Sequence, residues 1–247
     1  MLTAMSTQMG RASAGDWAPE LQKAKTYEQL LLDIILGVLP PGSPLDERRL
    51  AARYGVGLAG VRDALGRLAL EGLVARRSRI GTTVAPLDLR EIEQAFEVRH
   101  MLEARSAALA ARNAAPADIA AILGAFVEAE AAIAASDFRA MLAMDRTFHK
   151  AVAEATGNPT LARYIISLQN IATRFWIHAM ERQTAEEQLA DVALHRALGE
   201  AIAARDPAAA EAAAMRVVGE PPSAYPPKRQ AAAPDAMILP RGVGITT

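Results

Sequence analysis

The sequence predicts a mainly α-helical protein in two parts, a small N-terminal part that ends in a β-hairpin and a larger all-α antiparallel bundle. Three observations favour helices. Hydrophobic residues make up 51% of the 247 residues while aromatic residues make up only 4%. Alanine is concentrated, with 38 among the 133 residues from Pro86 to Val218, and apolar residues recur three and four positions apart. The length allows one large domain or two small ones.

The N-terminal part begins after a segment with no periodic pattern. Residues 1–22 mix Ser, Thr, Gly and Met and are predicted to be a disordered tail. From residue 25 onward, Tyr27, Leu30, Leu31, Ile34 and Val38 follow a helical spacing. Gly37 and the following Pro40-Pro41-Gly42 end this first helix.

Two shorter helices and a hairpin follow. The second helix is predicted to start near Asp46 and to break at Gly55, and the third places Val61, Leu65 and Leu68 inward before Gly72 ends it. Residues 73–76 and 82–85 are predicted to be short strands around a basic loop. Helix, helix, turn, helix and hairpin is the order of a winged helix-turn-helix, here predicted over residues 23–85.

The bundle is predicted over residues 88–218 as six antiparallel helices. Their expected ranges are 88–113, 116–135, 137–156, 158–182, 185–204 and 207–218. Asp137, Asn158 and Asp206 have the residue types that cap helix N-termini. Residues 219–247 contain six prolines and no apolar period, which predicts a second disordered tail.

Composition also bounds the class of protein. The chain has no cysteine, which excludes disulfides, thiolate metal sites and cysteine nucleophiles. No apolar run approaches the roughly 20 residues of a membrane span, and no secretory signal is evident, so we expect a cytoplasmic protein without a membrane partner. The net charge of −1 conceals ten Lys/Arg against six Asp/Glu over residues 23–85 and thirteen against eighteen over residues 86–218. A basic module joined to an acidic one suggests a polyanion partner for the first.

Many residues in order now resemble one known family. Tyr27-Glu28-Gln29-Leu30, Pro40-Pro41-Gly42, Leu45-Asp46-Glu47-Arg48-Arg49-Leu50-Ala51 and Val61-Arg62-Asp63-Ala64-Leu65 are similar to the winged helix of GntR-family transcription regulators. Beyond it, Glu97-Val98-Arg99, Asp145-Arg146-Thr147-Phe148-His149, Gly157-Asn158-Pro159 and His195 resemble the FCD effector domain of the FadR subfamily. The resemblance covers about residues 25–218.

This resemblance implies a double-stranded DNA operator as partner. Arg62 points outward from the third helix, opposite Val61 and Leu65, and an arginine there contacts phosphate or guanine. The resemblance adds further candidates on the second helix, at the start of the third helix and on the wing: Arg48, Arg49, Leu58, Ala59, Arg77, Gly81 and Thr82. A solvated surface arginine or a solubilising loop is the alternative explanation for the basic residues.

One departure from the family lies at the start of the third helix. Relatives place Ser or Thr, Arg, Thr and Pro where this chain has Gly57-Leu58-Ala59-Gly60. Leu58 cannot donate hydrogen bonds, and a lost bidentate base contact costs about 1–3 kcal/mol of discrimination. Gly57 also removes a side-chain helix cap. We therefore expect an altered operator or weak specificity.

The resemblance implies a metal and effector site in the bundle. Asp145 and His149, spaced i, i+4 on one helix, and His195 match three ligands of a divalent Zn, Ni or Mn ion. Arg99 matches a position that grips the carboxylate of a small effector. The alternative is a set of hydrogen-bonded core residues in which Arg99 pairs with Glu103 or Asp145.

The fourth ligand that the resemblance implies is missing. A histidine is expected about 22 residues after His195, where the chain has Val217 and Val218. The missing histidine and the proline-rich tail suggest the hypothesis that a frameshift near Val217 replaced the last helix. The gene's other reading frames test this hypothesis, because the absence of an out-of-frame histidine would refute it.

Three functions compete at this point. The first is a homodimeric transcription regulator, a repressor, controlled by a small organic acid. The second is a degenerate regulator that lacks specific DNA or metal binding, which the residues at Leu58 and Val218 favour. The third is a metal-dependent enzyme on the bundle, although no general base is evident beyond Asp145, His149 and His195.

Overall fold

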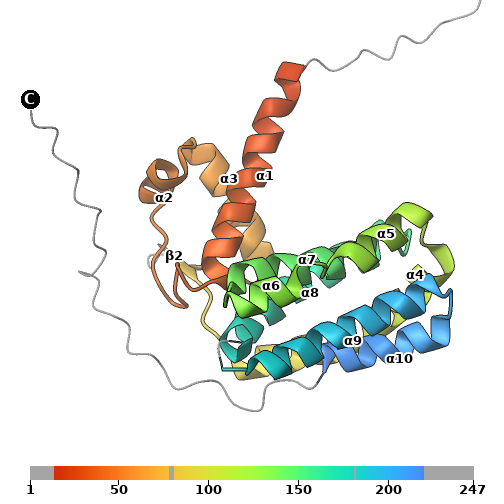
Figure 1. The fold of residues 1–247 in the computed structure, drawn as a ribbon. Coiled ribbons are helices and arrows are strands. Elements are labelled where there is room, and N and C mark those ends of the chain that lie inside the picture. The colour runs from red at the N-terminus through yellow and green to blue at the C-terminus, as the bar shows by residue number, and fades with distance from the viewer. Residues whose placement is uncertain (1–13, 78–80, 181, 220–247) are drawn as a thin grey trace, which may run out of the picture.

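The computed structural model describes residues 14–77, 81–180 and 182–219, and it has the two predicted parts (Figure 1). The first part contains three helices and a hairpin: α1 (Ala14–Ile35), α2 (Glu47–Tyr54), α3 (Leu58–Leu70), β1 (Val74–Arg77) and β2 (Gly81–Val84). The second is the helical bundle, with α4 (Leu89–Asn113), α5 (Pro116–Gly124), α6 (Ala129–Ala134), α7 (Phe138–Glu154), α8 (Pro159–Met180), α9 (Ala185–Ala203) and α10 (Pro207–Val218).

Local signals explain the boundaries of α2 and α3. The Asp46 carboxylate accepts a hydrogen bond from the backbone N–H of Arg49 at 2.8 Å and caps α2. Gly55 ends α2 in the left-handed conformation, with φ 64°. Gly57 occupies the N-cap of α3 and provides no side-chain hydrogen bond, as its sequence position predicts. The turn between α2 and α3 therefore depends on the left-handed conformation of Gly55, and no side chain caps the start of α3.

The first part has its own apolar core. Residues from α1, α2, α3 and the hairpin pack together, including Leu30, Leu31, Ile35, Leu50, Val61, Leu65, Leu68 and Leu73. The two strands are antiparallel, with Val74 opposite Val84 and Arg77 opposite Gly81. This is the winged helix-turn-helix that the order of elements predicts.

Two boundaries differ from the sequence expectation. α1 begins at Ala14, so residues 14–22 are helical although the sequence suggested a disordered tail there. Alanine, glutamate, leucine and glutamine in that stretch have high helix propensity and extend the helix without an apolar stripe. The single helix expected over residues 116–135 is instead two helices, α5 and α6, because Gly124 is a poor helix former and residues 125–128 turn.

The remaining bundle helices match their predicted ranges within a few residues. Asp137 and Asp206 cap α7 and α10, and Asn158 accepts hydrogen bonds from the N–H groups of Thr160 and Leu161. Gly219 ends α10. The expected tails fall mostly on residues 1–13 and 220–247, which lie outside the described residues.

The two parts share contacts along α1, α7 and α8 (Figure 1). Leu142 of α7 is fully buried and packs within the core of the first part. Arg146 of α7 forms an ion pair with Glu28 of α1 at 3.0 Å, and Arg174 of α8 donates to the carbonyl of Ala85 at 2.6 Å, just after the hairpin. The bundle therefore holds the winged helix through α7 and α8. In the described part of the chain, every helix is too short or too polar to cross a membrane.

Candidate functional sites

The first candidate surface is the outward face of α3. Leu58, Ala59 and Arg62 are exposed on it, while Val61 and Leu65 are fully buried on the opposite face. The helical period produces this division, since residues one turn apart share a face. The face that the sequence assigned to DNA is therefore open for contact.

Arg62 is held by its neighbours at this surface. Its Nε donates to Glu47 Oε2 of α2 at 2.7 Å, and its backbone carbonyl accepts a hydrogen bond from Arg76 Nη2 of β1 at 3.2 Å. The Arg62 side chain keeps 62% of its area exposed. An exposed ion pair contributes little and is easily exchanged, so a phosphate oxygen can replace Glu47.

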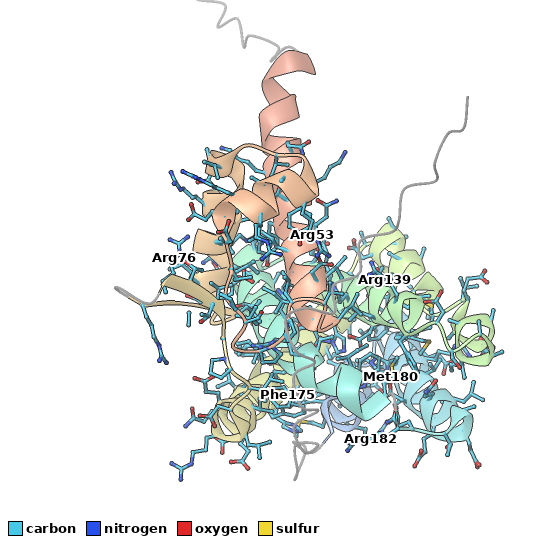
Figure 2. The ribbon with its side chains drawn as sticks, turned by 90° about the vertical axis from the view of Figure 1, so that its left-hand side faces the viewer. Arg53, Arg76, Arg139, Phe175, Met180 and Arg182 are labelled. Carbon is cyan, nitrogen blue, oxygen red and sulfur yellow. The ribbon has the colours of Figure 1, made fainter. Side chains whose placement is uncertain are left out.

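The other basic candidates surround α3. Arg48 and Arg49 are exposed on α2, and Arg77 and Gly81 are exposed at the end of the hairpin, where Thr82 is half-buried. Figure 2 shows Arg53 and Arg76 on this part of the molecule, whereas Phe175 and Met180 lie in the bundle. The structure thus gathers the predicted DNA-contacting residues on the α2, α3 and hairpin part.

The second candidate site lies inside the bundle. Asp145 and His149 from α7 meet His195 from α9, and one ligand atom from each lies within 4.8 Å of the others. All three side chains are buried. Asp145 Oδ1 is 3.6 Å from both His149 Nε2 and His195 Nε2. The three predicted metal ligands therefore form one cluster although α9 is about 50 residues further along the chain.

Hydrogen bonds orient both imidazole rings in the same way, with Nδ1 facing an oxygen acceptor and Nε2 facing Asp145. His149 Nδ1 lies 3.0 Å from Glu103 Oε2, and His195 Nδ1 lies 2.8 Å from the carbonyl oxygen of Asp191. Carboxylate and carbonyl oxygens only accept hydrogen bonds, so each Nδ1 carries the proton. Each Nε2 is therefore directed to Asp145, as in metal sites whose second ring nitrogen is held by a carboxylate or carbonyl.

The distances and charges of the cluster fit a cation. A separation of 3.6 Å exceeds the roughly 2.7–3.2 Å of a hydrogen bond, whereas two ligands of a tetrahedral zinc ion lie about 3.4 Å apart. Among the described residues His195 Nε2 is buried without a hydrogen-bond partner. Burial alone would raise the pKa of Asp145, but His149, His195 and Arg99 lower it. Burial alone would lower the pKa of His195, but Asp145 and Asp191 raise it.

Arg99, the predicted effector-binding residue, lies beside this cluster. Arg99 Nε donates to Glu103 Oε1 at 2.6 Å, and both side chains are buried. Burial alone would raise the pKa of Glu103, but Arg99 and His149 hold it at about 2. Arg99, Glu103 and His149 thus form a continuous polar chain. The pairing of Arg99 with Glu103 is the alternative that the sequence left open.

Space next to the cluster is small. A cavity of about 10 Å³ is lined by residues that include Glu103, Ser106 and His149, which leaves room for roughly one water molecule. The larger groove, of about 740 Å³, lies elsewhere, between α3 and α8, and its lining includes Arg67, Leu70 and Tyr164. The small cavity, and not the larger groove, borders the buried Glu103 and His149.

The position of the missing fourth histidine is apolar in the structure. Val218 is buried against residues that include Ile92, Phe96 and Phe175, and Val217 packs against the main bundle core. Neither can bind a metal ion. Sequence reasoning missed another polar neighbour, Gln169 of α8, whose Nε2 donates to Asp145 Oδ2 at 2.8 Å. It could have been found as a polar residue on the apolar stripe of Ile165 and Ala172.

Comparisons with known proteins match each of the two parts to a family model. Residues 22–84 match the family model of bacterial regulatory proteins of the gntR family, and residues 94–220 match the FCD domain. The chain is 32% identical over 134 residues to a probable D-xylose utilization operon transcriptional repressor of Paenarthrobacter nicotinovorans. It is 27% identical over 133 residues to the HTH-type transcriptional regulator McbR of Escherichia coli.

These two alignments cover 54% of this chain each, and they span 59% and 60% of the relatives, less than two thirds of their length. A solved structure of E. coli McbR/YncC has a similar fold, with a TM-score of 0.71 and 22% identity over 80% of this chain and 93% of that one. At this identity the structural likeness concerns the fold alone.

Proposed function

The chain belongs to the GntR family of bacterial regulatory proteins and carries the FCD domain, and we propose that it is a homodimeric transcription repressor controlled by a small organic acid. The family is one of transcription regulators and not of enzymes, which disfavours a metal-dependent enzyme. Two-fold symmetry in the protein would match an inverted repeat in the operator.

The observation that carries the proposal is the open face of α3 beside a basic hairpin. In this proposal α3 enters the major groove, where Arg62 contacts guanine or phosphate and Ala59 contacts a thymine methyl. Arg48 and Arg49 contact the backbone from α2. The wing residues Arg77, Gly81 and Thr82 approach the neighbouring minor groove or backbone, and Leu58 contributes only apolar contact.

The bundle supplies the control site in this proposal. In it a divalent ion of Zn, Ni or Mn is bound by Asp145, His149 and His195. The clustering of their ligand atoms supports this assignment. A bound ion would supply positive charge for an effector carboxylate. Arg99 supplies a second positive charge, and it must leave Glu103 to reach the effector. The small cavity implies that side chains move when an organic acid enters.

Direct contacts support a route from this site to the DNA-binding part. Arg146 follows Asp145 in the chain, pairs with Glu28 of α1 and donates to Asn170 Oδ1 at 2.5 Å. Asn170 Nδ2 donates to the Tyr27 hydroxyl at 3.4 Å. Because Arg146 is the next residue in the chain, a shift of Asp145 would also move Arg146 and so disturb its ion pair with Glu28 of α1. An effector changes DNA affinity only if it favours one of two arrangements of the parts.

Selection of bound sequences from a random DNA pool, at about 150 mM salt to suppress nonspecific phosphate binding, tests the proposal. Enrichment of a short inverted repeat is the expected result. A folded protein that enriches no sequence would overturn specific binding and favour the degenerate regulator, a second candidate that Leu58 and the missing cap at Gly57 support.

Arg62→Ala is the matching test of the surface. It should weaken binding to the selected site at every salt concentration, because the contact with DNA is lost. Arg139→Ala is the matched control, since Arg139 is an exposed arginine at the start of α7, in the bundle (Figure 2). Equal DNA affinity in the two variants would refute the role of Arg62.

A further inference from the structure

The buried polar cluster contains a fourth side chain that neither the family pattern nor the comparisons identify. Gln169 of α8 is 6% exposed, and its Nε2 donates to Asp145 Oδ2. Asp145 therefore presents Oδ1 to the two histidines and Oδ2 to Gln169. Gln169 is in direct contact with the residue at the centre of the cluster.

The orientation of the Gln169 amide follows from its partner. An ionised carboxylate only accepts hydrogen bonds, so the amide nitrogen and not the oxygen must face Asp145. The Gln169 oxygen, Oε1, is then buried without a hydrogen-bond partner among the described residues. Oε1 and Nε2 are bonded to the same carbon, so this unpartnered oxygen belongs to an amide whose nitrogen is held by the Asp145 carboxylate.

Apart from the Gln169 N–H that Asp145 Oδ2 accepts, the described side chains of the cluster face one another with acceptor atoms. Asp145 Oδ1, Gln169 Oε1, His149 Nε2 and His195 Nε2 are acceptor atoms when both imidazoles are neutral. Buried acceptors are unfavourable without a positive partner. A divalent cation would supply that partner to the ligand atoms of Asp145, His149 and His195, and Gln169 Oε1 is a further buried acceptor without a partner among the described residues.

We propose that Gln169 supplies the fourth protein ligand, through Oε1, in place of the histidine that relatives carry near position 218. This inference rests on the proposed metal site and adds a residue to it. Val218 is buried among apolar side chains that include Ile92 and Phe175 and cannot bind an ion, so in this proposal the fourth contact comes from α8 and not from α10. Nε2 of the same amide orients Asp145, which is the support that ligating carboxylates require.

The replacement changes which ions the site prefers. A set of two imidazole nitrogens and two oxygens is harder than a set of three nitrogens and one oxygen. Carbonyl and carboxylate oxygens suit manganese, whereas imidazole suits zinc and nickel. The site should therefore discriminate less strongly in favour of Zn²⁺ over Mn²⁺ than a site with a third histidine. Gln169→His should restore that discrimination.

The experiment titrates the full chain, first stripped with a chelator, with Zn²⁺ and with Mn²⁺ in competition with a chromophoric chelator. Gln169→Leu removes both the proposed ligand oxygen and the N–H that orients Asp145, and it should weaken both affinities by at least roughly 10–100-fold. Gln169→His should raise the ratio of Zn²⁺ to Mn²⁺ affinity at least about tenfold. The absorption spectrum of bound Co²⁺ gives a second readout, because it reports the coordination of the ion independently of DNA binding.

Gln188→Leu is the matched control. Gln188 is also a buried glutamine, on α9, but its Nε2 donates to the backbone carbonyls of Met180 and Gln183. Its loss should leave both metal affinities unchanged. A Gln169→Leu variant that binds metal as the unmodified protein does, while His195→Ala does not, would overturn the role of Gln169 and leave the proposed metal site standing.

Two further outcomes are decisive. If the unmodified chain binds neither ion, the metal site itself fails and the role of Gln169 falls with it. If Gln169→Leu does not fold, Gln169→Glu decides, because a carboxylate oxygen at the same place can still bind the ion. Retained affinity in Gln169→Glu supports the ligand, and a loss of more than about tenfold overturns it.

Discussion

The two parts of the molecule each contain an arginine–glutamate ion pair, and the two pairs differ in their surroundings. Arg62 and Glu47 lie on the winged helix with 62% and 30% of their side chains exposed. Arg99 and Glu103 lie in the bundle with 7% and 8% exposed. Their N–O separations, 2.7 and 2.6 Å, are nearly the same.

Burial therefore decides what each pair can do. Water screens the exposed pair, so it costs little to break and Arg62 is available to DNA. The buried pair has lost its hydration, and each charge depends on the other. On the winged helix, a ligand can replace one partner of the exposed ion pair at little cost. In the bundle, each buried charge needs another charged group as its partner.

The largest expected effect is on the stability of the bundle. Arg99→Ala leaves Glu103 buried with His149 Nδ1 as its remaining hydrogen-bond partner, and breaking a buried pair in this way costs about 3–5 kcal/mol. Arg62→Ala should cost less than about 1 kcal/mol. Urea unfolding of both variants measures the difference, and equal losses would contradict the comparison.

A smaller effect is expected for DNA specificity. Leu58→Arg provides the fork of donors that the exposed start of α3 lacks, and one bidentate base contact contributes about 1–3 kcal/mol of discrimination. The variant should favour its selected operator over a single-base mismatch more strongly than the unmodified protein does. Leu58→Lys is the control for charge alone, since lysine adds the charge without the planar fork.

The contact through Asn170, between the bundle and the winged helix, is expected to have a comparable or smaller effect on DNA affinity. Asn170→Ala removes hydrogen bonds to Arg146 and Tyr27, each worth about 0.5–1.5 kcal/mol or somewhat more where a charge takes part. DNA affinity measured with and without bound metal should then differ less than in the unmodified protein. Unchanged coupling would show that the contact through Asn170 is not the route.

The smallest effect concerns the start of α3. Gly57→Ser adds a side-chain cap where the structure has none, which should stabilise the protein by a few tenths of a kcal/mol. Thermal unfolding should show a small rise in Tm. A fall would mean that the serine does not reach the free N–H groups of α3.

Local patterns were sufficient for most of the fold. The spacing of Val61, Leu65 and Leu68 predicted the buried face of α3, and Asp46, Asp137 and Asp206 predicted helix starts that the structure has. Such signals act over one or two turns, so the sequence contains them completely. The early start of α1 and the break between α5 and α6 were missed because helix propensity is weak and α1 has no apolar stripe at its beginning.

The sequence by itself determined the order of elements, the family resemblance and three of the clustered polar residues, Asp145, His149 and His195. Only the tertiary structure decided which atoms meet. The direction of each imidazole depends on Glu103 of α4 and on the backbone of α9, and Gln169 joins the cluster because α8 packs beside α7. Burial and contact between distant helices are properties of packing, which no local spacing encodes.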